Sequence, residues 1–598
     1  VKKPIITSPY VLETLKSVTN EGNGCLDRGK LENAITAFDK ALAIDPDFTP
    51  ALNNKAVALY YLRRLDEATQ TLLYTLRVKP NDADALNTLG SCCKENGKLT
   101  QAVVLYRHAV AANAYHALGW LNLGRCYMDM KLYAASIKAY ERMLALEPGH
   151  PEALAELTQL LALACEWKKS GLIRERLADI VREGTAAEPF TVMSHLPDLQ
   201  CENARRWSER HYPQASPYNS SCPFPADARN DDKLRIGYLS SDFQHHATAA
   251  LISELFELHD RSRFTIYAYS HGRDDGGEER QRIVKAVDTF RDITVMNDSE
   301  AVALIRSDGI DILVDLKGYT KDHRLSLMAH RPAPIAMHYL GYPGSIGLRA
   351  IDYYIGDAEA PEAEFSEALI RLPHSYQIND RKRPLPETRP RAEYGLPEQG
   401  FVFCDFNNVN KISPEVFDTW MRLLEAVKGS VLWLFAAHPY PMENLRQAAA
   451  EHGIDPKRLV FATVAKMADH LARYRHVDLF LDTRPYAGHT TVSDALWCGV
   501  PVIALAGESF CSRVAAGLLK AVGLPELVTD SLETYEALAL ELAGDQKRRM
   551  EIKAHLEKGR MTFPLFNSKA TTRAIEAAYV KAAQFHRDGI PPMGFAAA

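Results

Sequence analysis

The chain has 598 residues, of which 46% are hydrophobic and 24% charged, the balance of a soluble globular protein of about four domains. Its 70 Lys and Arg against 76 Asp and Glu leave a formal net charge of −6, so a nucleic-acid partner is not expected. The 10 cysteines form no Cys-x-x-Cys pair, and no apolar run suits a signal peptide or membrane span, which predicts a cytoplasmic protein with reduced thiols.

A repeat with a 34-residue period occupies residues 15–150. The period predicts helix–turn–helix units that cross where small side chains lie, and that stack because one unit cannot bury its own apolar face. The pattern resembles the tetratricopeptide repeat, whose superhelical groove holds a peptide or protein; an oligomerisation or spacer arm is the alternative. A small column, a large apolar column and a proline column share the period: Gly22, Ala56, Gly90, Gly124; Phe38, Leu72, Tyr106, Tyr140; Pro46, Pro80, Pro148.

After the repeats the sequence changes from helical to mixed patterning. Residues 151–229 are predicted to be a helical extension that ends in a proline-rich linker, 212–225. Beyond it, short apolar runs alternate with helical stretches, which is typical of parallel sheets covered on both faces. The runs are 234–239, 264–269, 312–316, 335–340, 351–355, 401–406, 431–435, 459–461, 479–481 and 500–505.

The number of these runs predicts two doubly wound α/β domains, 230–385 and 396–585, the second including the C-terminal helices. The polar segment 380–386 between them is a candidate hinge. Ligands of such sheets bind beyond the carboxyl ends of the strands, so two facing sheets predict a cleft. Neither a Gly-x-Gly-x-x-Gly fingerprint after a strand nor a P-loop is present, which argues against a nicotinamide, flavin or P-loop nucleotide site.

Two strand-end loops of the second domain suit a diphosphate. After strand 479–481, Gly488 and His489 lead into a helix that starts with Thr490 and Thr491, where free N–H groups and the helix dipole favour an anion. Lys411 follows strand 401–406 and would stabilise charge on a diphosphate leaving group. A structural helix cap and a solvated loop lysine are the respective alternatives.

His246 follows the first strand of the first domain, in the stretch Ser241-Asp242-Phe243-Gln244-His245-His246. A histidine at the carboxyl end of a strand can act as a general base near neutral pH. A structural histidine is the alternative.

Together these motifs resemble the O-linked N-acetylglucosamine transferases of glycosyltransferase family 41, over about residues 15–580. The resemblance is carried, after the repeats, by a series of segments in chain order: Ser240–Phe243 with His246, Arg331–Ile335, Leu340–Gly344, Phe406-Asn407 with Lys411, Ser430–Leu434, Gly488–Thr491 with Asp494, and Gly507–Ala515.

The resemblance implies a GT-B pair of Rossmann-like α/β domains behind a tetratricopeptide superhelix, with a UDP-sugar in the cleft and inversion at the sugar carbon. It implies no cofactor and no catalytic metal. Lys411 and His489 to Thr491 would hold the diphosphate, Asp494 the ribose, and the Ala465 backbone with His470 the uracil. Other residues that the resemblance assigns are the donor-binding Asn408, Gly341, Tyr342 and Pro343, and the catalytic pair His246, as general base, and Lys411.

The expected activity is transfer of GlcNAc from UDP-GlcNAc to Ser or Thr of polypeptides held by the repeats. Asn408, Asp311 and Met467 depart from the family pattern near the donor, so transfer of glucose or another sugar, to oxygen or to nitrogen, remains an alternative. A repeat scaffold with an inactive UDP site is a further alternative. A homodimer is kept open.

Overall fold

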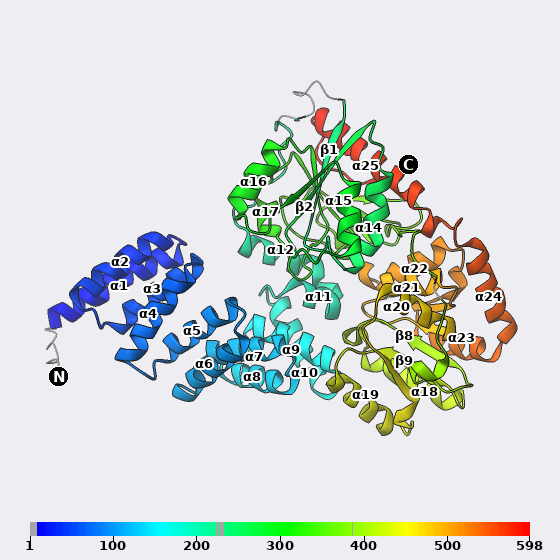
Figure 1. Cartoon of the computed structure of the whole chain (residues 1–598), viewed down its shortest axis with the longest axis horizontal. Coiled ribbons are helices and arrows are strands. Elements are labelled where there is room, and N and C mark those ends of the chain that lie inside the picture. Colours follow the sequence, from blue (N-terminus) through cyan, green and yellow to red (C-terminus); the bar gives the residue numbers. More distant parts are fainter. Residues whose placement is uncertain (1–8, 223–224, 226–231, 386, 598) are drawn as a thin grey trace. The chain divides into compact units, whose positions relative to one another are not determined.

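The computed structural model describes residues 9–222, 225, 232–385 and 387–597, and Figure 1 shows the chain. Parts of three predicted segments lie outside the described residues: Pro223, Phe224 and 226–229 of the segment 151–229, residues 230–231 of the first α/β domain, and Pro386 of the candidate hinge. The chain divides into two compact units, one ending at Leu160 and one beginning at Leu161. Within the described ranges, no helix has the length and apolar character needed to cross a bilayer.

The first unit is an array of antiparallel helix pairs, as the repeat predicts. At three of the four repeats the small residue is a glycine that lies against the large apolar residue of the next helix. A Cβ built on Gly22 would lie 2.4 Å from Phe38, and one on Gly90 2.7 Å from Tyr106, so only glycine allows these helices to cross so closely. The helices are α1 (Pro9–Asp27), α2 (Leu31–Ile44), α3 (Thr49–Tyr61), α4 (Leu65–Val78), α5 (Ala83–Glu95), α6 (Leu99–Ala112), α7 (Ala117–Asp129), α8 (Tyr133–Leu146) and α9 (Pro151–Ala164), the last of which crosses the unit boundary.

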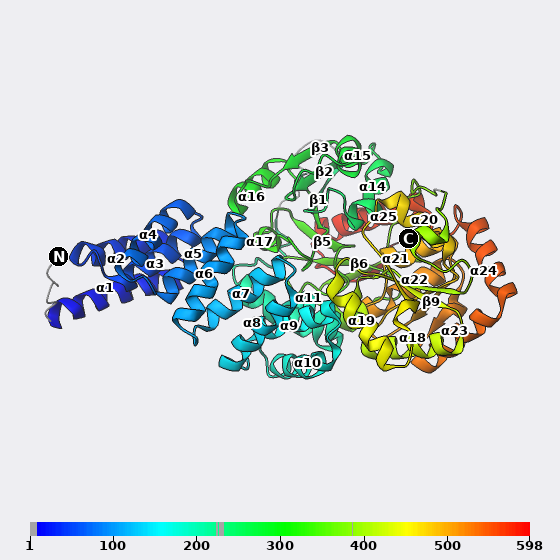
Figure 2. The same ribbon diagram turned by 60° about the horizontal axis from the view of Figure 1, so that its bottom comes forward.

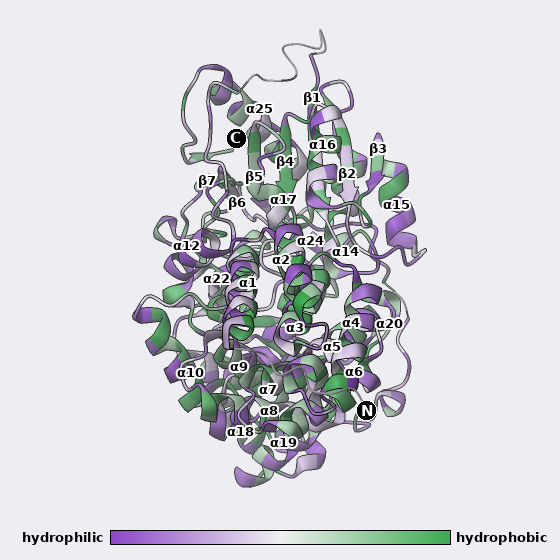
Figure 3. Cartoon of the chain, turned by 90° about the vertical axis from the view of Figure 1, so that its left-hand side faces the viewer, coloured by the Kyte–Doolittle hydropathy of each residue, from purple (hydrophilic) through white to green (hydrophobic). Residues whose placement is uncertain are grey.

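The second unit contains two parallel sheets, which confirms the predicted α/β class. In the first sheet the strand order is β14-β7-β6-β5-β4-β1-β2-β3, and every neighbouring pair is parallel. Its central strands are buried on both faces, and Figure 3 shows the hydrophobic residues along β4 and β5. The strands are β1 (Leu234–Ser240), β2 (Phe264–Ser270), β3 (Thr289–Asp292), β4 (Ile312–Asp315), β5 (Ile335–Tyr339), β6 (Tyr353–Gly356), β7 (Ala368–Arg371) and β14 (Phe595–Ala596).

The second sheet has the order β10-β9-β8-β11-β12-β13 and is also parallel throughout. Both sheets are covered by helices, which is why their strands can be apolar on both faces. The strands of this sheet are β8 (Val402–Asp405), β9 (Val431–Phe435), β10 (Leu459–Ala462), β11 (Leu479–Leu481), β12 (Val502–Leu505) and β13 (Val528–Thr529).

The helices of the second unit fall into three groups. Before the first sheet come α10 (Trp167–Arg182), α11 (Pro189–His195) and α12 (Gln200–His211); among the strands of that sheet lie α14 (Ala247–Leu258), α15 (Glu278–Ala286), α16 (Asp298–Ser307) and α17 (Leu325–Ala329). With the second sheet and after it come α18 (Pro414–Ala426), α19 (Pro439–Glu451), α20 (Met467–Arg473), α21 (Thr490–Trp497), α22 (Phe510–Ala521), α23 (Leu532–Gly544), α24 (Gln546–Gly559) and α25 (Ser568–Arg587).

The end of the chain returns to the first sheet, whereas the sequence groups residues up to 585 with the second domain. Helix α25 packs against α14 and β5, and β14 pairs with β7; Figures 1 and 2 both show α25 beside α14. The contact is polar as well as apolar, because the buried Glu576 carboxylate on α25 accepts hydrogen bonds from the His259 ring and the Asp260 backbone. A boundary drawn from sequence order misses this return because α25 lies beyond the second sheet in the chain.

Candidate functional site

Each sheet has a topological switch point, a strand whose two neighbours in the sheet come from connections that run to opposite sides of it. In the second sheet β8 lies between β9 and β11, and in the first sheet β1 lies between β2 and β4. Loops at the carboxyl ends of such strands diverge and leave room for a ligand. The loops after β8 and β11 carry Lys411 and His489, and the loop after β1 carries His246.

Lys411 connects the two loops of the second sheet. It ends a short 3₁₀ helix (Val409–Lys411), donates from Nζ to the Ala487 carbonyl at 2.8 Å and lies 3.7 Å from the centroid of the Tyr486 ring. Burial lowers the pKa of Lys411, while the nearby Asp482 and Asp405 carboxyls oppose that change. The ammonium group is therefore held at the switch point with few protein hydrogen bonds, which leaves donors for an anion.

Two buried carboxyl groups beneath Lys411 were not among the predicted site residues. Asp405 ends β8 and Asp482 follows β11, and burial raises the pKa of both. Asp482 accepts hydrogen bonds from the Gly488 backbone at 2.7 Å and from Asn407 at 3.3 Å, which shapes the loop that leads to His489. Their signal in the sequence is an acidic residue at the carboxyl end of an otherwise apolar strand.

Helix α21 begins without a side-chain cap from its N-cap residue. That N-cap residue is His489, and because its side chain makes no cap hydrogen bond, the first N–H groups of the helix keep hydrogen-bonding capacity. The Thr491 hydroxyl donates to Asn407, which holds the helix start beside the loop after β8. His489 Nδ1 lies 3.3 Å from the Tyr376 hydroxyl, and its buried Nε2 has no hydrogen-bond partner within the described residues. Burial and the Lys411 charge hold the pKa of His489 well below its usual value.

A second group of predicted residues lies one turn further along α21. Asp494 Oδ2 is 3.8 Å from His470 Nε2 on α20, and Asp494 Oδ1 accepts a hydrogen bond from Arg383 at 2.6 Å. Ala465 lies in the loop between β10 and α20, and its side chain is half-buried. The structure therefore brings His470 and Asp494 together, and places Asn408 in the Lys411 loop with an exposed side chain.

His246 caps α14 at the switch point of the first sheet. Its Nδ1 accepts a hydrogen bond from the Thr248 backbone at 3.1 Å and lies 3.3 Å from Asp242 Oδ2. Both Asp242 oxygens already accept from the buried Lys317 ammonium, each at 2.8 Å, which weakens their attraction for a histidine proton. Burial lowers the pKa of His246. The cap bond places the proton of the neutral ring on Nε2, where it can donate to a substrate.

The Gly341-Tyr342-Pro343 segment builds a loop rather than presenting polar side chains. The Tyr342 ring is fully buried and its hydroxyl donates to the Pro189 carbonyl at 3.1 Å. A Cβ on Gly341 would lie 2.0 Å from the Leu316 carbonyl oxygen, so the close approach of two strand-end loops requires glycine. The Tyr342 side chain is thus bound to the first residue of helix α11.

Helix α11 and Tyr376 join the loops of the two sheets. The centroid of the Phe190 ring lies 6.5 Å from that of the Tyr342 ring and 6.2 Å from that of the Tyr486 ring. Phe190 therefore packs against a loop of each sheet. The Tyr376–His489 pair makes a second connection. Among the residues that the structure describes, no three His, Cys, Asp or Glu side chains gather to hold a metal, and independence from a metal stays a prediction.

Comparisons with known proteins identify the family and the fold. The model of Glycosyl transferase family 41 matches residues 216–390 and 386–575, and that of the Psidin N-terminal TPR repeats region matches residues 24–139. A solved structure of a lysine-to-methionine mutant of the Thermobaculum terrenum O-GlcNAc transferase is 26% identical, with a TM-score of 0.65 over 97% of this chain and 99% of that one.

Two curated relatives carry related names. The probable UDP-N-acetylglucosamine–peptide N-acetylglucosaminyltransferase SEC of Arabidopsis thaliana is 33% identical over 464 residues, which cover 73% of this chain and 48% of that protein. The UDP-N-acetylglucosamine–peptide N-acetylglucosaminyltransferase of Caenorhabditis elegans is 28% identical, over 61% of this chain and 42% of that protein. The chain thus spans about half the length of the curated relatives that it matches.

Proposed function

The chain belongs to glycosyl transferase family 41, and we propose that it transfers N-acetylglucosamine from UDP-GlcNAc to Ser or Thr hydroxyls of polypeptides. The names of the Arabidopsis and C. elegans relatives support this donor, and the tetratricopeptide array supports a polypeptide acceptor. Inversion at the sugar carbon and independence from a metal belong to the same proposal.

The observation that carries the proposal is the convergence of Lys411 and the uncapped start of α21. Lys411 is fixed by the Ala487 carbonyl, and the helix start keeps free N–H groups at the same switch point. A diphosphate there would meet a buried cation and the positive end of a helix dipole. Both act most strongly on the charge that develops as UDP leaves, so they stabilise the transition state more than the ground state.

The nucleoside end of the donor would lie further along α21. Asp494 keeps one carboxylate oxygen that is not bonded to Arg383, which suits a ribose hydroxyl donor. His470 on α20 lies 3.8 Å from Asp494, and Ala465 precedes α20 in the chain; the proposal assigns the uracil ring to His470 and the Ala465 backbone.

On the acceptor side, His246 is the residue predicted from the sequence to act as the general base. The cap bond from Thr248 occupies Nδ1, so Nε2 carries the proton and donates in this state. To accept a proton at Nε2, the ring would have to move its own proton to Nδ1, opposite Asp242. We propose that His246 orients the acceptor or the departing oxygens through Nε2, and that it becomes a base only when the cap bond is released.

Mass measurement tests the activity. The protein is incubated with a library of Ser- and Thr-containing peptides and with UDP-GlcNAc, UDP-glucose or no donor, each with and without a chelator. We expect an N-acetylhexosamine gain with UDP-GlcNAc only, removable by base-catalysed β-elimination and unaffected by the chelator. A hexose gain from UDP-glucose would contradict the proposed donor. UDP binding without transfer to any peptide would favour a scaffold with an inactive site.

A further inference from the structure

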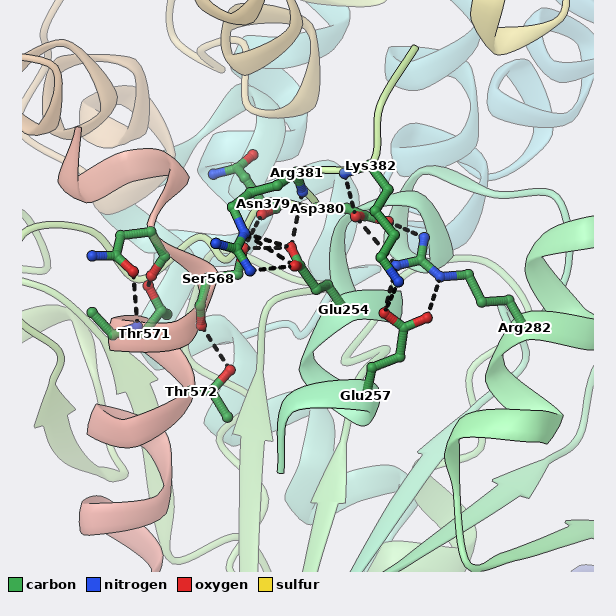
Figure 4. Close-up of polar contacts among 12 residues, drawn as sticks. Glu254, Glu257, Arg282, Asn379, Asp380, Arg381, Lys382, Ser568, Thr571 and Thr572 are labelled. Carbon is green, nitrogen blue, oxygen red and sulfur yellow. Dashed lines mark hydrogen bonds and ion pairs between the residues drawn. The ribbon is translucent and has the colours of Figure 1, made fainter. Parts of the chain in front are cut away.

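The connection between the two sheets, defined here as Asn379–Arg383, is tied to the helices of the first sheet by charged side chains. Arg381 donates from Nη2 to Glu254 on α14 at 2.6 Å, and its backbone N–H donates to the same carboxylate at 2.9 Å. Lys382 pairs with Glu257 at 2.7 Å, and Asp380 pairs with Arg282 on α15. Figure 4 shows these contacts side by side. Most of the connection is therefore held in place by the first sheet.

Arg383 hydrogen-bonds Asp380 and Asn379 within the connection and also contacts the second sheet's helix α21. Its Nη1 donates to Asp494 Oδ1 at 2.6 Å and to the Ser493 hydroxyl at 3.1 Å. The guanidinium carbon also lies 5.7 Å from the centroid of the Trp497 ring. The side chains of Arg383 and Asp494 are only 5% and 4% exposed, so water screens this ion pair little.

The contact with Arg383 determines the orientation of the Asp494 carboxylate and which of its oxygens can bind a ligand. A planar guanidinium holds a carboxylate in one orientation, which a flexible ammonium does not. With Oδ1 taken by Arg383, Oδ2 remains on the side of His470, 3.8 Å from its Nε2. Without Arg383, the buried carboxylate would lose this charge partner and the hydrogen bond that fixes its orientation.

We propose that Arg383 is a positioning residue for the donor site: it orients Asp494 for the ribose and connects donor affinity to the segment that joins the sheets. The proposal rests on the proposed function, in which Asp494 meets the ribose. It assigns a role to a residue outside the strand-end loops, on a segment that the sequence indicated only as a hinge.

The test compares substitutions within the connection. Arg383→Gln removes the charge, Arg383→Lys keeps it, and Lys382→Gln removes an exposed charge that pairs with Glu257 on the first sheet's helix α14. UDP affinity is measured by calorimetry, and kcat and the KM for the donor are measured by transfer to peptide. We expect Arg383→Gln to weaken UDP binding about tenfold and raise the donor KM similarly, with kcat at saturating donor changed less than about twofold. Arg383→Lys should recover part of the affinity, and Lys382→Gln should match the parent.

A double-substitution cycle separates positioning from general stability. Asp494→Asn alone should weaken UDP binding, and adding Arg383→Gln to it should cause little further loss, because Arg383 acts through Asp494. The proposal is overturned if folded Arg383→Gln binds UDP like the parent, or if the two losses simply add. Should Arg383→Gln fail to fold, an Arg383→Lys protein with unchanged UDP affinity would overturn it as well. A parent protein that does not bind UDP would overturn the proposed function instead.

Discussion

At the scale of a single residue, His246 combines a structural contact with a candidate chemical one. Its Nδ1 caps α14, and its half-exposed ring directs Nε2 away from that bond. Lys317 occupies both oxygens of Asp242, which removes the usual partner that would orient a histidine as a base. The two roles can be separated because asparagine caps helices well but has no imidazole.

We therefore predict different outcomes for two substitutions of His246. His246→Asn should keep the thermal midpoint and the UDP affinity of the parent but lower the transfer rate by about a hundredfold or more. His246→Ala should lose the same activity and also about 1 kcal/mol of stability, since the cap is gone. Transfer rates, calorimetric UDP affinity and thermal unfolding measure the three quantities. An Asn variant that transfers sugar at the parent rate would leave His246 with the cap alone.

At the scale of the helix, close packing in the repeats depends on side-chain volume at one column. Gly22 and Gly24 lie on the same helix α1, two residues apart, but face different surroundings. A Cβ on Gly22 would lie 2.4 Å from the Phe38 ring, whereas one on Gly24 would meet only the end of the flexible Arg28 side chain at 3.3 Å. Glycine has the same low helix propensity at both positions, but only at Gly22 does a neighbouring ring fill the space that a side chain would need.

We therefore predict that a glycine-to-alanine substitution changes the stability of the repeats in opposite directions at these two positions. Gly24→Ala should stabilise the repeats by about 0.5–1 kcal/mol, since alanine favours a helix. Gly22→Ala should destabilise them by about 1–3 kcal/mol, since the Phe38 ring must move to make room. Chemical unfolding followed by helical circular dichroism measures both. Equal effects of the two substitutions would contradict the crossing described here.

At the scale of the whole molecule, every residue proposed to contact the donor belongs to the second unit, which begins at Leu161. We predict that a fragment starting at Gly149, which keeps α9 whole, binds UDP within about twofold of the full chain, because it retains every residue proposed to contact the donor. Its kcat/KM for long polypeptides should fall more than that for short peptides. A loss of UDP affinity in a folded fragment would mean that the repeats contribute to the donor site.

Local patterns in the sequence were sufficient for much of the architecture and for part of the site. The repeat, the parallel sheets and the central strands follow from periodicity and from apolar runs, and the comparisons confirm the family. Edge strands such as β3 escaped prediction because their residues are polar and only partly buried. Lys411 and the Gly488–Thr491 segment stand out in the sequence because each follows a strand. The binding roles assigned to them stay predictions.

Contacts between distant segments appear only in the folded chain. Arg383 and Asp494 are 111 residues apart, and Lys317 and Asp242 are 75 apart, so no local period or motif relates them. The return of α25 to the first sheet is of the same kind. Periodicity reports which face of an element is buried, since the side chains of one face recur at a fixed short spacing along a helix or a strand. Which charged groups meet beneath that surface depends on how whole elements pack, and only the tertiary structure decides it.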